Sequence, residues 1–379
     1  MNVRGGYGSR LCRTAATVLA AAALASCSSG DGTSGSRVGD FLGGEADPGF
    51  ARASPEYALE FPADHGPHPR FQSEWWYFTG NLEGKAGRHF GFMFTIFRFA
   101  LSPDPVPRTS DWGTNQAWMA HFAITDTVGG TFYKTERFAR GAAGLAGARA
   151  DPFAVWLHDW SARTGGEESP FPLRLTAEED GHGVSLELRP AKPLVLQGER
   201  GYSRKGADPG NASHYYAYTR LEARGEVTVA GQVHAVSGTA WMDREWGTSA
   251  LGPGLAGWDW FALQLDDGRD LMFYQLRRDD GGRGPWSQGA LVAADGTRLP
   301  IDPDDVVLKP RAWWRSPESG RRYPVAWRLE IPSHGLDLEV AARAEAQEMT
   351  LNVDYWEGAV TVTGGRGERG VGYLEMTGY

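Results

Sequence analysis

Cysteine is almost absent from this chain, which has 2 among 379 residues. Cys12 lies inside an N-terminal segment typical of a targeting signal, and Cys27 lies at its end. If the signal is removed and Cys27 is modified, the mature chain keeps no free thiol. On that interpretation the sequence excludes disulfides, a cysteine-ligated zinc site and a cysteine nucleophile.

An excess of positive charge is also lacking. Lys and Arg number 38 against 47 Asp and Glu, so the formal net charge is −9. Nucleic-acid binding normally requires a basic patch, and we therefore expect no nucleic-acid partner.

Several chemical motifs are absent as well. The sequence has no Gly-x-Ser-x-Gly nucleophile elbow and no glycine-rich phosphate loop between a strand and a helix. His65 and His68 are three residues apart, but no third ligand lies nearby in the sequence. We therefore expect no serine-hydrolase mechanism, no cofactor and no metal.

The longest apolar run lies near the N-terminus. Basic residues precede an apolar stretch over residues 14–25, which is too short to span a membrane as a mature helix. The stretch ends in Leu24-Ala25-Ser26-Cys27, which resembles the bacterial lipobox and predicts cleavage before Cys27 and lipidation of its sulfur. We expect a protein of the bacterial cell envelope, lipid-anchored to a membrane and facing the periplasm or exterior. A plain secretory signal with a chance cysteine is the alternative.

Residues 27–64 are rich in Gly, Ser, Asp and Pro, which predicts a flexible tether. From residue 65 onward, short β-branched and aromatic runs alternate with Gly and Pro, and no long amphipathic helical pattern appears. Many short strands favour an all-β sandwich or barrel, and single glycines in aromatic hairpins favour the barrel, which can hold one small apolar ligand. The predicted strand runs are residues 119–125, 173–175, 184–188, 215–221, 290–293, 325–331 and 336–341.

Two hairpins occur twice, in the same order. The aromatic hairpin of residues 74–94 resembles that of residues 257–274, with Trp75 over Trp258 and Tyr77 over Trp260. The hairpin of residues 225–242 likewise resembles that of residues 358–376, and this second overlay makes Thr377 the counterpart of Asp243. We predict two related β-modules, residues 65–247 and residues 248–379.

The stretch 241–247, at the end of the first module, combines aromatic, acidic and basic side chains. In an extended strand Asp243 and Glu245 share one face, and Arg244 and Trp246 share the other. A carboxylate beside indoles is poorly solvated, so its pKa should rise and it could donate a proton. The alternative is a buried ion pair between Arg244 and one of the two acids that fixes the joint between modules.

Two further polar residues lie among aromatic ones. Glu74 precedes a double tryptophan and could act as an acid, or pair with an arginine such as Arg70 or Arg98. His121 lies in the middle of a predicted strand and is either a cavity contact or a hydrogen-bonded core residue. The tryptophans are expected in the core or in a cavity wall.

Seven separated motifs occur along the chain: His68-Pro69, Glu74-Trp75-Trp76-Tyr77, Met119-Ala120-His121-Phe122-Ala123, Trp241-Met242-Asp243, Glu245-Trp246, Trp258-Asp259-Trp260 and Tyr355-Trp356-Glu357-Gly358. Together they resemble a lipocalin-like family. It contains carotenoid 1,2-hydratase (hydroxyneurosporene synthase) and the secreted "predicted hydrolase" proteins encoded beside ABC transporters of the Att type. The resemblance covers nearly the whole chain after the tether, and it implies two lipocalin-like antiparallel β-barrels in tandem.

The hydratases of this family add water to a terminal double bond of an acyclic carotenoid without a redox cofactor. Their site includes a His and a Trp in a segment resembling Asp-His-Asn-Trp-Gly. Here Trp246 matches that Trp, but Arg244 replaces the His. A Tyr of the family site matches Tyr274, and Leu276 stands where an Asp is expected. The resemblance therefore places the chain closer to the secreted subgroup and predicts chemistry other than carotenoid hydration.

Two functions follow as hypotheses. The first is a membrane-anchored protein that binds an apolar small molecule or lipid and performs cofactor-free acid–base chemistry, such as hydration, hydrolysis or isomerisation. The second is a non-catalytic binding or carrier lipoprotein accessory to an envelope ABC transporter. The catalytic candidates are Asp243, Glu245, Glu74 and Tyr274, and the ligand-binding candidates are Trp75, Trp76, Tyr77, His121, Arg244, Trp246, Trp258 and Trp260.

Overall fold

β-Strands make up nearly all the regular structure of the protein. The computed structural model describes residues 36–37, 48–104, 109–166, 170–248, 251–252 and 254–379. The predicted signal peptide, Cys27 and residues 28–35 and 38–47 of the expected tether lie outside these residues. The helical segments in the described part are short 3-10 turns: η1 (Ala63–His65), η2 (Lys85–Gly87), η3 (Pro303–Asp305) and η4 (Pro332–His334). The predicted all-β fold is confirmed.

The described helical turns include none with the length and apolar character needed to cross a membrane.

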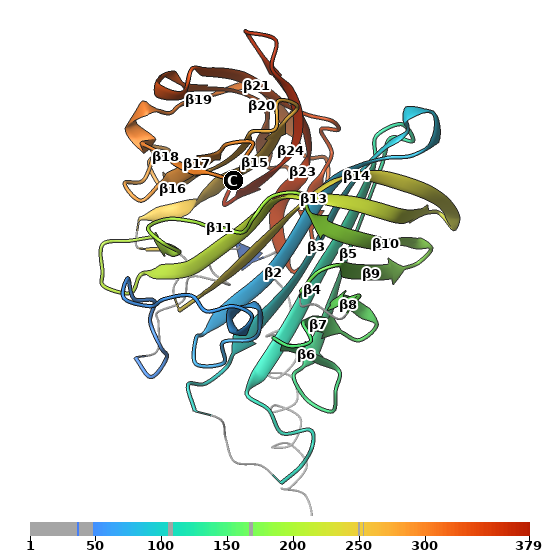
Figure 1. The fold of residues 1–379 in the computed structure, drawn as a ribbon, viewed down its shortest axis with the longest axis vertical. Helices are drawn as coiled ribbons and strands as arrows, with labels where there is room; N and C mark the ends of the chain where they lie inside the picture. The colour runs from blue at the N-terminus through green and yellow to red at the C-terminus, as the bar shows by residue number, and fades with distance from the viewer. Residues whose placement is uncertain (1–35, 38–47, 105–108, 167–169, 249–250, 253) are drawn as a thin grey trace, which may run out of the picture. The chain divides into compact units, whose positions relative to one another are not determined.

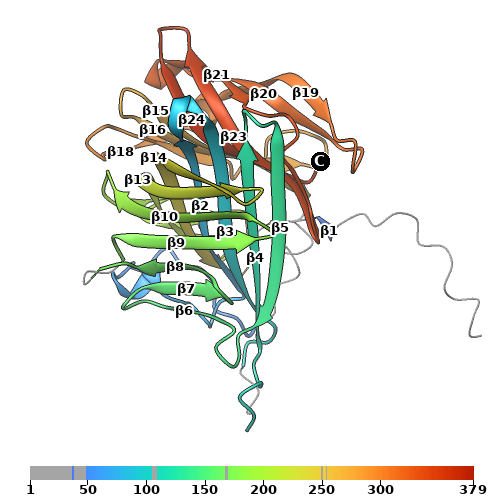
Figure 2. The same cartoon turned by 90° about the vertical axis from the view of Figure 1, so that its right-hand side faces the viewer.

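The first of two sheets holds 13 strands in the described residues (Figure 1). In hydrogen-bonded order its main path is β5 (Thr131–Arg140), β4 (Gln116–Asp126), β3 (His89–Ala100), β2 (Ser73–Glu83), β14 (Gln232–Gly247), β13 (Ala212–Val229), β10 (His182–Pro190), β9 (Leu173–Glu179), β8 (Trp160–Thr164), β7 (Ala154–Leu157) and β6 (Ala146–Arg149). The short strands β11 (Val195–Leu196) and β12 (Tyr202–Arg204) pair with β13. The sheet curls into a barrel-like form, because β7 near one end contacts β3, β4 and β5 near the other (Figure 2).

The second sheet holds 11 strands in the described residues. Its main path is β18 (Arg298–Ile301), β17 (Gln288–Val292), β16 (Asp270–Arg278), β15 (Leu255–Leu265), β24 (Arg369–Thr377), β23 (Val353–Gly364), β21 (Leu336–Ala342), β20 (Arg322–Ile331) and β19 (Val307–Arg315). Two short strands, β1 (Ser36–Arg37) and β22 (Glu348–Thr350), pair with β23. The predicted strand runs coincide with β4, β9, β10, β13, β17, β20 and β21.

Burial differs between the outer and the central strands. In β21 the buried side chains Leu336, Leu338 and Val340 alternate with the exposed Asp337 and Glu339, as expected for a strand with one face in a core. Strands β2, β14, β15 and β24 instead bury residues of both faces. One face of each central strand builds the core of its own sheet, and the other face meets the other sheet.

The strand register shows which positions of the two sheets correspond. Tyr77 on β2 pairs with Asp243 on β14, and the equivalent Trp260 on β15 pairs with Glu375 on β24. The counterpart of Asp243 is therefore Glu375, and the prediction of Thr377 was wrong by two residues. A shift of two preserves the alternation of faces, so the hydrophobic pattern alone does not detect it.

The contact between the central strands of the two sheets is called the seam here. Strand β2 contacts β24, β3 contacts β23, and β13 contacts β15 and β16. Two equivalent amides cross the seam in opposite directions: Asn81 Nδ2 donates to the carbonyl of Gly372 at 3.1 Å, and Gln264 Nε2 donates to that of Ala240 at 3.0 Å. Because donors and acceptors occupy matching positions, the seam has approximate internal two-fold symmetry.

Residues 48–64 of the expected tether pack on the first sheet. Phe50 and Ala53 are buried, and the N–H of Ala51 donates to the carbonyl of Arg70 at 2.9 Å. The folded part of the chain therefore begins before the expected residue 65.

A buried ion cluster joins the sheets at one end of the seam. The Asp270 side chain on β16 is fully buried and lies 2.7 Å from Lys192 Nζ and 2.6 Å from Arg220 Nη2, both in the part of the chain that forms the first sheet. Thr219 Oγ1 also donates to it at 2.8 Å. Because a buried carboxylate needs such partners, this cluster fixes how the sheets dock.

Replacing Asp270 by Asn should lower the free energy of unfolding by about 3–5 kcal/mol, because it leaves two cations at the seam without their carboxylate. Urea denaturation at neutral pH measures the loss. The matched control is Asp267→Asn, which removes an exposed ion pair with Arg269 and should cost less than about 1 kcal/mol. Equal losses in the two variants would contradict the structural role of Asp270.

Candidate functional site

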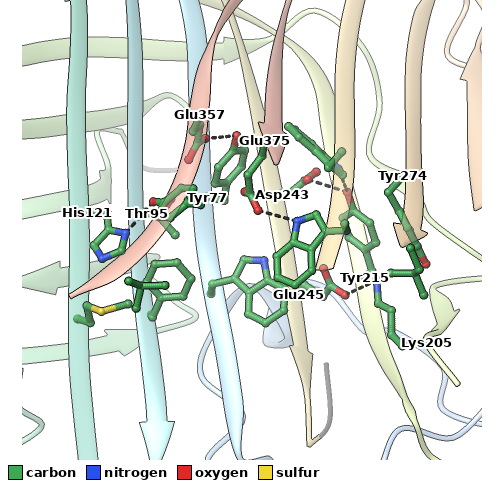
Figure 3. Close-up of a pocket in the computed structure, with 18 residues that line it drawn as sticks. Tyr77, Thr95, His121, Lys205, Tyr215, Asp243, Glu245, Tyr274, Glu357 and Glu375 are labelled. Atoms are coloured by element: carbon green, nitrogen blue, oxygen red, sulfur yellow. Dashed lines mark hydrogen bonds and ion pairs between the residues drawn. The ribbon is translucent and has the colours of Figure 1, made fainter. Parts of the chain in front are cut away.

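A cavity of about 110 Å³ lies in the seam (Figure 3). It receives side chains from both sheets, because residues of the central strands alternate between a core face and a seam face. Its size is comparable to a cavity of about 150 Å³ that holds benzene in another protein. Its aromatic walls are Trp75, Tyr77, Phe97, Tyr215, Trp258, Trp260, Tyr274 and Tyr355.

Asp243 projects into this cavity between two hydrogen-bond donors. Tyr215 OH donates to its Oδ2 at 2.6 Å, and Trp241 Nε1 donates to its Oδ1 at 2.7 Å. Burial raises the pKa of Asp243 to about 8, because loss of hydration outweighs both hydrogen bonds and the nearby Glu245 and Glu375 add repulsion. The raised pKa agrees with the prediction from its tryptophan-rich surroundings, and it favours the protonated form of this carboxyl at neutral pH.

Two further acids face the cavity from the second sheet. Glu357 on β23 and Glu375 on β24 are directly opposite each other across the strand pair. Tyr77 OH donates to Glu357, and Trp258 Nε1 donates to Glu375 at 2.6 Å. Burial and the neighbouring charge of Glu375 raise the pKa of Glu357 well above its usual value, and burial raises that of Glu375 to about 7. Glu357 therefore holds its proton more firmly.

The fourth acid, Glu245, is neutralised by a lysine. Lys205 Nζ lies 3.0 Å from Glu245 Oε1 and 4.2 Å from the ring centroid of Tyr274. Burial alone would lower the pKa of Lys205, but Glu245 and Tyr274 raise it overall, so the amine is an ammonium ion rather than a nucleophile. Tyr274 OH is also 2.9 Å from Ser203 Oγ.

A histidine occupies the opposite end of the cavity from Lys205 (Figure 3). His121 Nδ1 is 2.7 Å from Tyr355 OH, and its Nε2 is 3.7 Å from Glu136 Oε2. Burial lowers the pKa of His121, although Glu136 partly offsets the effect, so the imidazole is neutral at neutral pH.

The structure divides the predicted site residues into two groups. The first group lines the cavity and consists of Asp243, Glu245, Tyr274, Trp75, Tyr77, His121, Trp258 and Trp260. The other group projects from the opposite face of β2 and β14 into the core of the first sheet and consists of Glu74, Trp76, Arg244 and Trp246. The second group is separated from the cavity by the sheet itself.

This second group forms a buried ion cluster. Both Arg98 and Arg244 contact the Glu74 carboxylate, and the backbone N–H of His68 donates to each of its oxygens at 3.0 Å. Burial opposes ionisation, but the two arginines outweigh it and hold the pKa of Glu74 well below its usual range. The guanidinium of Arg244 also lies 3.9 Å from the ring centroid of Trp76.

The pairings correct one sequence-based alternative and support another. Glu74 does pair with Arg98, one of the arginines considered for it. Arg244 does not pair with Asp243 or Glu245, because adjacent strand residues point to opposite faces. Its partner is Glu74 on the neighbouring strand.

Sequence reasoning missed five ionisable residues of the cavity. Glu357 and Tyr355 lie in a segment that carried the family resemblance, and Glu375 is the register counterpart of Asp243. Alternation and the internal duplication together could have identified these three. Lys205 comes from a loop and gave no signal, and Tyr215 stood unmarked in a predicted strand.

Across the described residues, no group of three or more His, Cys, Asp and Glu side chains is arranged to hold a metal ion. His68 instead bonds Asp64 at 2.9 Å, and His65 bonds Tyr216 OH at 2.7 Å.

Two curled antiparallel sheets that share a cavity at their seam define a tandem lipocalin-like β-protein. The family model described as AttH-like matches residues 52–379. The chain belongs to the AttH-like family.

Solved structures show the same fold. A protein assigned as AttH from Nitrosomonas europaea is 37% identical, with a TM-score of 0.77 over 87% of this chain and 100% of that one. Kievitone hydratase from Nectria haematococca is 15% identical, with a TM-score of 0.64 over 86% of this chain and 95% of that one. CghA with Sch210972 is 13% identical, with a TM-score of 0.53 over 88% of this chain and 97% of that one. At these identities the last two show the fold alone. Comparison with curated proteins gives no match.

Replacing Glu74 by Gln should lower the free energy of unfolding by about 3–5 kcal/mol at neutral pH, because Arg98 and Arg244 lose their buried counter-ion. The stabilisation by Glu74 exists above its unfolded-state pKa of about 4.3 and disappears as pH falls toward its depressed folded-state pKa. Denaturant unfolding at several pH values should show the gap between wild type and variant narrowing in acid. Glu339→Gln, at an exposed pair, is the control.

Proposed function

We propose that the seam cavity binds an apolar, unsaturated small molecule and performs cofactor-free acid–base chemistry on it, of the kind that adds water to a double bond or removes it. The observation that carries the proposal is Asp243, a carboxyl with a pKa of about 8 in an aromatic-walled cavity. An acid that keeps its proton at neutral pH can protonate an alkene, which an ordinary aspartate cannot.

Other groups of the cavity fit the steps that follow protonation of the double bond. Asp243 transfers its proton to one alkene carbon, and the positive charge formed on the neighbouring carbon faces the rings of Trp258 and Trp260. Water adds to that carbon and releases one proton to Glu375, whose pKa of about 7 lets it accept a proton at neutral pH. The products are an alcohol, an Asp243 carboxylate and a protonated Glu375, and proton exchange with solvent restores both acids.

One structural relative supports the reaction class. Kievitone hydratase has the same fold at 15% identity, and its name describes water addition. Carotenoid hydration is not proposed, because Arg244 stands where the carotenoid hydratases have a His and lies outside the cavity, paired with Glu74.

The alternative function is a binding or carrier lipoprotein accessory to an envelope ABC transporter. It needs the same aromatic cavity but no proton donor. The raised pKa of Asp243 favours the catalytic proposal, because a carrier for an apolar ligand gains nothing from burying an acid at a cost in stability.

Asp243→Asn should reduce turnover by about 10²–10⁴-fold and change ligand affinity by only a few-fold, because the amide keeps the shape and loses the proton. Candidate ligands come from mass spectrometry of small molecules that co-purify with the protein, and water addition is followed by incorporation of oxygen-18 from labelled water. Wild-type activity should fall as pH rises through about 8, where Asp243 deprotonates, and fall as pH drops through about 7, where Glu375 protonates.

The matched control is Asp337→Asn at an exposed ion pair with Arg328, which should leave turnover unchanged. Ligand binding without any turnover by the wild type would favour the carrier. Full turnover by the Asp243 variant would remove this residue from the role of acid.

We also propose that lipidated Cys27 holds the protein at a membrane of the bacterial envelope, where apolar ligands are concentrated. The support is the lipobox-like segment Leu24-Ala25-Ser26-Cys27. Cys27→Ala should abolish incorporation of labelled fatty acid and move the mature protein from the membrane fraction to the soluble one. Unchanged membrane association would contradict the anchor.

A further inference from the structure

A chain of titratable side chains connects the buried Glu357 with the protein surface. Glu357 interacts with Tyr355, two residues before it on β23, and the OH of Tyr355 lies 2.7 Å from His121 Nδ1. On the other side of the imidazole, Nε2 lies 3.7 Å from Glu136 Oε2. Glu357 has 2% of its surface exposed and His121 1%, whereas the Glu136 side chain is 17% exposed.

Strand pairing and side-chain alternation set the positions of these four residues. His121 on β4 and Glu136 on β5 are directly opposite each other in the first sheet. Tyr355 and Glu357 are two residues apart on β23 of the second sheet, so both project toward the seam. The path therefore crosses from one sheet to the other, and it forms only because the sheets dock.

We propose that Glu136, His121 and Tyr355 form a proton-transfer path that joins the Glu357 carboxyl to solvent. The use of this path in turnover rests on the acid–base chemistry proposed for the cavity. There it exchanges protons between solvent and Glu357, the acid directly opposite Glu375 on the second sheet, which the aromatic walls otherwise separate from water.

Each transfer balances. Glu136 takes a proton from solvent and passes it to His121 Nε2, while His121 Nδ1–H passes its proton to the Tyr355 oxygen. Tyr355 gives its own hydroxyl proton to the Glu357 carboxylate. The net result is that one proton moves from solvent to Glu357. Glu136 ends as a carboxylate again, and His121 and Tyr355 end neutral. The imidazole returns from the Nε2–H to the Nδ1–H tautomer before the next transfer.

The internal symmetry of the seam shows that this arrangement is not required by the fold. The register counterpart of His121 is Gln288, and that of Tyr355 is Tyr215. Gln288 Nε2 bonds Ser203 Oγ at 2.8 Å, and an amide cannot accept a proton on one atom while it releases one from another. The equivalent end of the cavity thus has the tyrosine and lacks the relay.

The charges around His121 leave the imidazole able to act as a relay. The titratable groups that face it are Glu136 from β5 and Tyr355 from β23, with Phe97 packing against the ring at 5.5 Å. Partial burial would raise the pKa of Glu136, but the nearby His121 and the hydrogen bonds from Asn352 outweigh it and keep that pKa below its usual value. Glu136 is therefore a carboxylate at rest that can collect a proton from water.

Infrared spectroscopy tests the path without a substrate. The C=O stretch of a protonated carboxyl shifts when its proton is replaced by deuterium, and Glu357→Gln identifies the band of Glu357. After rapid mixing of the full chain into D₂O, the rate of that shift reports proton exchange at Glu357. We expect Glu136→Gln and His121→Phe to slow it about tenfold or more.

Two features keep the result interpretable. Glu136→Gln is isosteric and lies at the surface, so the variant folds even if His121→Phe does not. His89→Phe is the control, because His89 is also buried but bonds Asn81 and Thr127 away from the path, and it should leave the exchange rate unchanged. Wild-type exchange in Glu136→Gln, with unaltered amide exchange, would overturn the path. The outcome is independent of the Asp243→Asn turnover assay, so the two proposals fail separately.

Discussion

Each sheet buries both faces of its central strands, and most other properties of the molecule depend on this constraint. On β2 and the second half of β14, residues 240–247, side chains alternate between the core of the first sheet and the seam. Polar residues on either face are thereby removed from water and must find a partner or lose their charge. On a strand with one solvent-exposed face, polar residues of that face would need neither a partner nor the loss of their charge.

The acids of β2 and β14 show both solutions. On the core face Glu74 remains ionised because two arginines neutralise it. On the seam face Asp243 has only neutral donors, a tyrosine and a tryptophan, and its carboxyl keeps the proton instead. Two carboxyls on adjacent strands therefore take opposite protonation states, one stabilising the structure and the other available for proton transfer.

The patterns of residues along single strands were enough to predict the features that depend only on the alternation of side chains. They gave the strand runs, the common face of Asp243 and Glu245, and the raised pKa of Asp243. They did not give the partner of Arg244, because Glu74 is 170 residues away and adjacent only through strand pairing. Glu375 was missed because a register shift of two preserves the pattern, and Lys205 because its position depends on a loop. The sequence alone therefore did not show which distant segments pair with each other.

The reciprocal amide bonds of Asn81 and Gln264 give the seam the geometry of an isologous dimer interface, in which the same patch is used twice. In a homodimer of identical subunits, any substitution at such an interface appears at both ends. Covalent linkage removes that restriction, because the two copies of each position can diverge separately while their stoichiometry stays fixed. His121 at one end of the seam and Gln288 at the other are such a divergence, which two identical subunits could not have combined.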